Sequence, residues 1–187
     1  LALGAKVAIM RRNVATLEKL RAALGRHMPV DSLVCIGCDV TDDSIVGTSV
    51  SAITGAFGGL DVAICLAGGV QPEANAIGGR SLQDVTSAAI IEQMRVDFIG
   101  AVNVVRRSEA VLKATGQSPC AVLVSSMSSQ FPGLGGVHVG YGPAKAATDT
   151  FLAGVARDWG TWNARINAVA IGFGIGDQNR HILLTPD

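Results

Sequence analysis

The only tyrosine of the chain stands four residues before a lysine, in Tyr141-Gly142-Pro143-Ala144-Lys145. On a helix, positions four apart share a face, so these two side chains would lie one turn apart. A nearby ammonium favours the tyrosinate form of a phenol. Such a tyrosine can give or accept a proton near neutral pH, as carbonyl reduction and alcohol oxidation require. We expect Tyr141 to be an acid/base and Lys145 its activator; the alternative is a tyrosine capping an ordinary helix.

A serine run, Ser125-Ser126-Met127-Ser128-Ser129, precedes this segment and follows the apolar run 121–124. If that apolar run is a strand, its end would present a hydroxyl toward the oxygen of the same substrate. The order of strand, serines, loop, Tyr-x-x-x-Lys and long helix is a stronger indication of an active site than the spacing alone.

The composition indicates one domain over residues 1–187. Hydrophobic residues make up 49%, and the 15 acidic and 15 basic side chains balance. This balance offers no basic surface for nucleic acid or an anionic membrane. The segment 1–6 does not resemble a signal peptide, and the uncharged stretch around 120–144 is too rich in Ser, Gly and Pro to span a membrane. We expect a soluble, cytoplasmic protein without nucleic-acid or membrane partners.

The cysteines are not expected to do chemistry. Cys35 and Cys38 have redox or metal spacing, but no second pair completes a zinc site. They lie within an apolar run rather than at a helix start, so nothing there would lower a thiol pKa. We predict structural thiols, no disulfide and no metal.

Short apolar runs alternate with amphipathic segments along the chain. Strands are predicted at 7–10, 32–36, 60–66, 121–124 and 165–170. Helices are predicted at 14–25, 46–57, about 90–114 and about 140–160. This alternation is typical of a parallel, doubly wound α/β sheet, which binds ligands beyond the carboxyl ends of its strands. The candidate residues fall at those ends: Arg11, Arg12, Asp39, Ala67-Gly68-Gly69, Ser126 and Gly172.

The chain resembles a short-chain dehydrogenase/reductase over nearly its whole length. The resemblance is carried by Cys38-Asp39-Val40-Thr41, Ala67-Gly68-Gly69, the serine run, Tyr141-x-x-x-Lys145 and Arg165-Ile166-Asn167-Ala168-Val169. It implies a Rossmann-like, three-layer α/β/α fold. The segment 178–184 resembles a narrower branch, the D-mannonate or fructuronate oxidoreductases.

The resemblance implies that Tyr141 exchanges the substrate proton, that Lys145 also holds the nicotinamide ribose, and that a serine polarises the carbonyl. Counting from the strand selects Ser126 for that serine. The family's usual spacing to the tyrosine selects Ser128, which would otherwise line the substrate pocket.

For the cofactor, Arg11 and Arg12 occupy the strand end that faces the adenosine ribose in this family. Guanidinium groups suit a 2′-phosphate, so NADP(H) is favoured over NAD(H); the alternative is a solvated basic turn. Asp39 is expected near the adenine or, alternatively, as a helix cap. The remaining cofactor positions implied by the resemblance are Val40, Ala67, Gly68 and Gly172.

The mid-helix asparagine that this family uses for a relay water is Asp97 here. Asp97 could accept a hydrogen bond from such a water, or be an exposed helix acid beside Arg95. Asn179 and Arg180 could bind a sugar-acid carboxylate, or belong to a polar lid, and His138 could line the pocket.

The family's first strand and Gly-rich turn are absent, and Cys65-Leu66 replaces the usual asparagines. We therefore expect a piece of a longer chain, truncated at both ends. The missing strand would lie at the centre of the sheet and leave two strands without backbone partners on one side.

Three functions follow. The first is an NADP(H)-dependent oxidoreductase that interconverts a ketone and a secondary alcohol on a sugar acid. The second is a reductase of acyl or other lipid ketones. The third is a catalytically impaired dinucleotide-binding or scaffold protein. The resemblance also implies a homodimer or homotetramer formed through the helices near 90–114 and 140–160.

Overall fold

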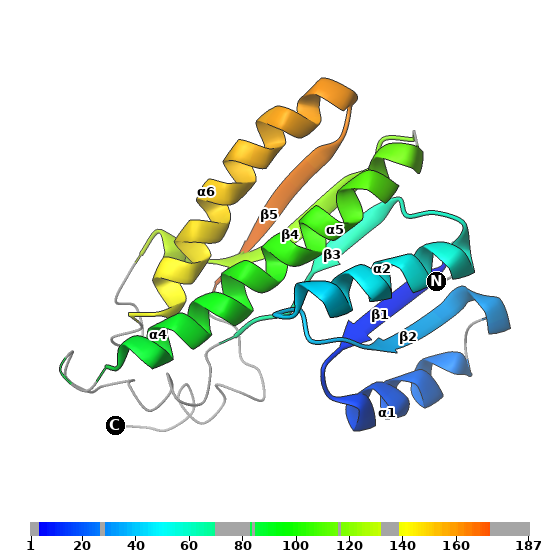
Figure 1. Ribbon diagram of the computed structural model, residues 1–187, viewed down its shortest axis with the longest axis horizontal. Helices are drawn as coiled ribbons and strands as arrows, with labels where there is room; N and C mark the ends of the chain where they lie inside the picture. Colours follow the sequence, from blue (N-terminus) through cyan, green and yellow to red (C-terminus); the bar gives the residue numbers. More distant parts are fainter. Residues whose placement is uncertain are drawn as a thin grey trace.

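Parallel strands alternate with helices in the computed structural model, which describes residues 4–26, 29–69, 83, 85–115, 117–131 and 139–172 (Figure 1). The strands are β1 (Val7–Arg11), β2 (Leu33–Gly37), β3 (Val62–Cys65), β4 (Cys120–Ser126) and β5 (Arg165–Ile171). The α-helices are α1 (Val14–Gly25), α2 (Asp43–Phe57), α4 (Ser87–Met94), α5 (Gly100–Thr115) and α6 (Tyr141–Trp159). Short 3-10 turns are η1 (Val30–Ser32), η4 (Met127–Ser129) and η5 (Gly160–Trp162). The predicted elements are confirmed, with ends that shift by a few residues.

Two hydrogen-bonded sheets form among the described residues. β1 pairs with β2, β3 pairs with β4, and β4 pairs with β5, all in parallel. β1 and β3 do not pair with each other, so each has a ladder on one side only. The strand order and parallel pairing are those of a Rossmann-like α/β fold.

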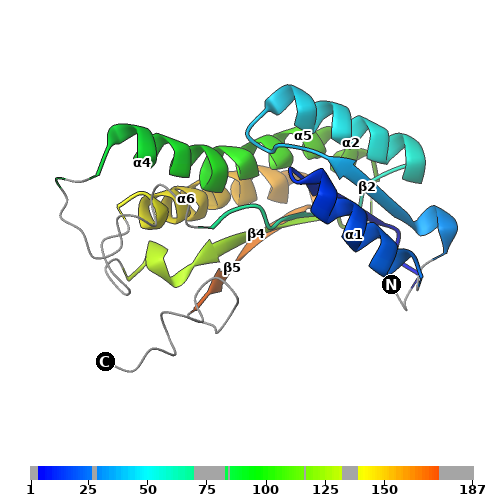
Figure 2. The same cartoon turned by 90° about the horizontal axis from the view of Figure 1, so that it is seen from below.

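Helices cover the two faces of the strands unequally. Figure 2 shows α2, α5 and α6 on one side of the strands and α1 on the other, beside β1 and β2. The second face of β3 and β5 is open among the described residues. Its apolar side chains are consequently exposed, by 46% at Val62, 57% at Ile64, 55% at Val169 and 53% at Ile171. The three-layer arrangement is therefore complete only around β1 and β2.

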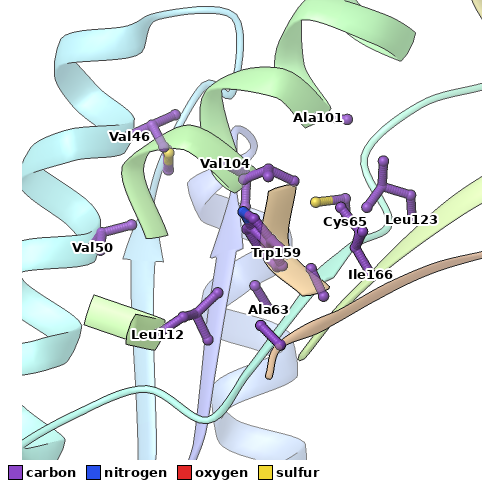
Figure 3. Close-up of a cluster of buried hydrophobic side chains, with 14 residues drawn as sticks. Val46, Val50, Ala63, Cys65, Ala101, Val104, Leu112, Leu123, Trp159 and Ile166 are labelled. Atoms are coloured by element: carbon purple, nitrogen blue, oxygen red, sulfur yellow. The ribbon is translucent and has the colours of Figure 1, made fainter. Parts of the chain in front are cut away.

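The main hydrophobic core lies between the β3–β4–β5 sheet and the helices α2, α5 and α6 (Figure 3). Trp159, at the end of α6, is fully buried there, and its ring lies 5.2 Å from that of Trp162. Leu112 of α5 and Leu123 of β4 are also fully buried. This core fixes the angle at which α6 approaches β4, and therefore where the first turn of α6 lies.

Side chains cap the first two helices. Asn13 accepts a hydrogen bond from the N–H of Thr16, as its position before α1 suggests. The cap of α2 is Asp42, which accepts from the N–H groups of Ser44 and Ile45. The alternative that Asp39 is the helix cap is therefore wrong.

The long helix predicted near 90–114 begins at Ser87 and contains a feature that its sequence pattern did not predict. Between α4 and α5, residues Arg95–Ile99 form a π-turn, η3. The extra residue in a π-turn changes which side chains face inward, and such turns are frequent at functional sites. Here Asp97 is buried, whereas Ile91 is 58% exposed.

The cysteine side chains differ in their burial. All four are free. Burial raises the pKa of the Cys35, Cys38 and Cys65 thiols, that of Cys65 to about 12. Cys38 and Cys65 are buried, and Cys35 is half-buried. Among the described residues, no group of His, Cys, Asp or Glu side chains could hold a metal ion, and no helix has the length and apolarity needed to cross a membrane.

Candidate active site

Ser126 ends β4, the 3-10 turn η4 follows directly, and α6 begins at Tyr141. The first turn of α6 packs closely against η4. A Cβ atom on Gly142 would lie 2.9 Å from the carbonyl oxygen of Ser128, which is closer than real Cβ contacts allow. Glycine after the tyrosine thus lets the helix start next to the serine turn. The predicted serines and the Tyr-x-x-x-Lys segment do come together at the carboxyl end of β4.

Tyr141 and Lys145 share one face of α6, as predicted. The Nζ atom of Lys145 lies 5.6 Å from the centroid of the Tyr141 ring. The lysine residue is only 3% exposed. Its ammonium donates to the carbonyl oxygen of Val124 at 2.9 Å and lies 2.9 Å from Oδ1 of Asp97. These two contacts hold the ammonium beside the phenol.

Asp97 is buried beneath this site, with 1% of its surface exposed. Its Oδ1 accepts from the N–H of Gly69 at 3.0 Å and also faces Lys145, and its Oδ2 accepts a hydrogen bond from the Gln93 amide. The alternative that Asp97 is an exposed acid beside Arg95 is therefore wrong. Arg95 instead pairs with Glu92 and donates to Thr41.

Gln93 is a site residue that sequence reasoning missed. Its amide donates to the carbonyl oxygen of Gly69 at 3.0 Å and to Asp97, and the residue is fully buried. The signal was its position four residues before Asp97, which places both on one helix face.

The turn after β3 fits tightly against the buried pair. At Gly68 φ is +151°, and a Cβ would lie 2.4 Å from Oδ1 of Asp97 and 3.1 Å from Nζ of Lys145. Only glycine fits at this position. Ala67 and Gly68 are themselves exposed, so the turn has one side against the ion pair and one side open.

The two candidate serines differ in their surroundings. Ser126 is 7% exposed, and its Oγ accepts from the N–H of Ser128 at 3.2 Å, so it caps η4. Ser128 lies within η4 and is half-buried. Among the described residues, no hydrogen bond joins either hydroxyl to that of Tyr141. Ser125 was not singled out from the sequence; its buried hydroxyl has no hydrogen-bond partner among the described residues.

Arg11, Arg12 and Asp39 gather where β1 and β2 end. The guanidinium of Arg12 lies 3.9 Å from the carboxylate of Asp39, and both arginines are exposed. Burial acts to raise the pKa of the Asp39 carboxyl. Hydrogen bonds from the N–H and hydroxyl of Thr41, together with Arg12 and Arg95, outweigh that effect and lower the pKa.

Two further cofactor candidates lie at strand ends. Val40 follows β2, and its carbonyl oxygen accepts from the Asn103 side chain of α5 at 2.9 Å. Gly172 follows β5, and a Cβ there would lie 3.9 Å from the sulfur of Met127 in η4. Gly172 therefore lies beside the serine turn. The substrate candidates His138, Asn179 and Arg180 lie outside the described residues.

Comparisons with known proteins agree with this arrangement. Residues 1–181 match the family model described as Enoyl-(Acyl carrier protein) reductase. The chain is 30% identical to the uncharacterized oxidoreductase UxuB of Bacillus subtilis, over 98% of this chain and 67% of that protein. It is 33% identical to a cyclohexanol dehydrogenase of Rhodococcus, over 72% of this chain and 48% of that protein. The chain thus spans between about half and two thirds of the length of these curated relatives.

A solved structure has the same fold. This structure is a short-chain oxidoreductase from Pseudomonas aeruginosa, whose description includes an atypical catalytic centre. It superposes with a TM-score of 0.85 at 22% identity, over all of this chain and 67% of that one. Family match, relatives and fold converge: the chain belongs to the short-chain dehydrogenase/reductase family of oxidoreductases.

Proposed function

We propose that this chain carries the catalytic centre of an NADP(H)-dependent oxidoreductase that interconverts a ketone and a secondary alcohol, with a sugar acid of the fructuronate or mannonate type as substrate. One observation carries the proposal: the Lys145 ammonium lies 5.6 Å from the ring of Tyr141, at the carboxyl end of β4. A phenol with a fixed ammonium beside it is suited to exchange a proton with a substrate oxygen.

In alcohol oxidation, the O–H bond of the substrate breaks, and its proton passes to the oxygen of ionised Tyr141. The C–H bond on the same carbon breaks as well, and a nicotinamide cofactor held by the residues named below would supply the acceptor for its hydride. Ser126 would donate a hydrogen bond to the carbonyl oxygen that forms, and Ser128 remains the alternative donor. Lys145 would stabilise the tyrosinate before the transfer. In the reduction direction the proton passes from Tyr141 to the substrate oxygen, and the hydride would pass from the cofactor to the substrate carbon.

The described residues fit a dinucleotide by their chemistry. Arg11 and Arg12 offer guanidinium groups for a 2′-phosphate, Asp39 offers a hydrogen-bond acceptor for an adenine amine, and Lys145 offers a donor for ribose hydroxyls. Val40, Ala67, Gly68 and Gly172 complete the cofactor side by their positions at strand ends.

The arginines test the cofactor choice. Replacing Arg11 and Arg12 by serine should weaken NADPH binding about 10- to 100-fold in a fluorescence titration and leave NADH binding nearly unchanged, since charged hydrogen bonds contribute about 1.5–3 kcal/mol. Lys19→Ser on α1 is a matched control that removes a cation outside the site. Equal losses for both cofactors would contradict the NADP(H) preference.

A second substrate class has its own support. The 33% identity to a cyclohexanol dehydrogenase favours an alcohol without charged groups, close to the acyl or lipid ketone alternative. A substrate panel separates the two. Turnover of hexuronates and not of cyclohexanol would support the sugar acid, and the reverse pattern would support an apolar ketone.

The direct test of the chemistry is Tyr141→Phe in the protein as its gene encodes it. Turnover should fall about 100- to 10,000-fold, the usual loss when an acid/base is removed, while NADPH binding is retained. Unchanged turnover would overturn the proposal. NADPH binding by the wild type without turnover of any carbonyl or alcohol in the panel would favour the impaired or scaffold alternative.

We also propose that α4–α5 and α6 pair with their copies in a homodimer or homotetramer. Ile91 and Ile99, which are 58% and 40% exposed on this segment, support an apolar contact there. Light scattering on the wild type and on Ile91→Lys should give a lower mass for the variant; equal masses would place the contact elsewhere.

A further inference from the structure

A buried titratable group beside Lys145 has no part in the proton transfer described above. This group is the carboxylate of Asp97, whose side chain is fully buried and lies 2.9 Å from the lysine ammonium. Burial of a charge is costly unless the charge is paired and hydrogen-bonded. The contacts that compensate the burial of this carboxylate therefore need an explanation.

We propose that Asp97 is a positioning residue whose negative charge limits how strongly Lys145 stabilises the tyrosinate form of Tyr141, and whose oxygens join the lysine to the turn after β3. The inference rests on the proposed role of Tyr141 and deepens it. It concerns the pH at which the tyrosine ionises, and therefore the pH at which the site can accept a proton.

Contacts from three parts of the chain hold the carboxylate. Lys145 approaches Oδ1 from α6, the N–H of Gly69 donates to the same oxygen from the turn, and the Gln93 amide donates to Oδ2 from α4. Gln93 also donates to the carbonyl oxygen of Gly69, so the turn is bound at both its N–H and its C=O. With both oxygens bonded within the protein, the carboxylate is placed to orient its partners.

The π-turn accounts for the position of Asp97. The main-chain carbonyl oxygen of Asp97 accepts from the Thr148 hydroxyl of α6 at 3.4 Å. The same hydroxyl lies 3.0 Å from the carbonyl oxygen of Ala144. The widened turn η3 thus packs against α6 one turn beyond the lysine, and it directs the Asp97 side chain back toward the ammonium.

Among the described residues, Asp97 and Lys145 are the only buried side chains that carry a charge. Cys65 of β3 has a thiol pKa of about 12, so it stays protonated at neutral pH. The end of β4 and the turn η4 present serines, and α4 presents the neutral Gln93. On α6 itself, Asp149 lies one turn after the lysine. These two buried charges, on Lys145 beside the phenol and on Asp97 beside the lysine, have opposite signs.

The sign of the effect follows. The ammonium favours tyrosinate, and the carboxylate beside it offsets part of that field. If Asp97 is replaced by asparagine, the ammonium is no longer offset. Tyrosinate then forms at lower pH.

This can be measured on Tyr141 alone, because it is the only tyrosine in the chain. The near-ultraviolet absorbance of tyrosinate is followed against pH, without cofactor or substrate. In Asp97→Asn the midpoint should fall below that of the wild type. Asp158→Asn is the matched control, because it makes the same change at the exposed end of α6, about 20 Å along the helix from Lys145. The midpoint of this control should equal that of the wild type. Equal midpoints for the wild type and Asp97→Asn would overturn the proposal.

A second comparison applies if Asp97→Asn does not fold. Lys145→Met is compared with the double variant Lys145→Met/Asp97→Asn, which has neither charge. A lower midpoint in the double variant supports the proposal, and equal midpoints overturn it. The titration does not depend on turnover. If Tyr141→Phe keeps its activity, the proposed function fails, but the titration still shows whether Asp97 affects the ionisation of Tyr141.

Discussion

The main chain of Gly142 lies against the carbonyl group of Ser128, so close that a Cβ on residue 142 would come within 2.9 Å of the oxygen. This contact brings the start of the tyrosine helix to the serine turn. Since the obstacle is main chain rather than the end of a flexible side chain, it cannot move aside cheaply.

Gly142→Ala should therefore destabilise the protein by about 1–3 kcal/mol, the usual cost of overpacking, and lower turnover by displacing Tyr141. Gly154→Ala, in the same helix, is the matched control. A Cβ at residue 154 meets nothing within 4 Å, so alanine should be neutral or stabilise the helix by up to about 1 kcal/mol. Chemical denaturation measures both. Equal effects of the two substitutions would contradict the close approach.

Gly68 gives a second pair of substitutions. At Gly58, φ is +82° and the space around it is open, so Gly58→Ala should cost only the backbone strain, about 1–2 kcal/mol. Gly68→Ala adds a collision with the carboxylate of Asp97 and the ammonium of Lys145. We expect it to destabilise the protein more than Gly58→Ala and to abolish turnover, as measured by thermal unfolding and an activity assay. A Gly68→Ala protein as stable as Gly58→Ala would show that the turn is not held against the ion pair.

The sequence indicated most of the fold, because apolar runs and helix caps are both features of neighbouring residues. Apolar runs of four to seven residues marked the strands, and caps such as Asn13 marked helix starts. Of the site, the spacing of Tyr141 and Lys145 and the position of Ser126 after a strand were visible for the same reason.

What the sequence did not reveal depends on contacts between distant segments. The π-turn at 95–99 keeps the apolar spacing of an ordinary helix, so nothing local distinguishes it, and the burial of Asp97 follows from that turn. Gln93 acts through the main chain of Gly69, a contact that no side-chain pattern encodes. Asp42 and Asp39 are both followed by residues that suit a cap, and the packing of α2 decides between them.

Burial of the Cys65 thiol predicts a pH-dependent stability. Its pKa rises from 9.0 to about 12 in the folded protein, with Lys145 acting in the opposite direction. The folded state therefore keeps this proton between about pH 9 and pH 12 while the unfolded state loses it. The corresponding stability is fully present below pH 9 and is lost as the pH rises through that window, by at most about 1.4 kcal/mol per pH unit.

Denaturant unfolding at several pH values should show this loss in the wild type and a shallower one in Cys65→Ala. Comparing the two slopes isolates the contribution of the Cys65 thiol. Cys35→Ala serves as the control, because that thiol is only half-buried. Parallel slopes for the wild type and Cys65→Ala would contradict the burial of this thiol.

The most direct test of the account is the ionisation of Tyr141 with and without its ammonium partner. Lys145→Met removes the positive charge 5.6 Å from the ring and leaves the carboxylate of Asp97 in place. The tyrosinate absorbance of this single tyrosine should then appear at a higher pH than in the wild type. A midpoint that does not move would mean that the lysine does not tune the phenol, and the proposed acid/base chemistry would lose its basis.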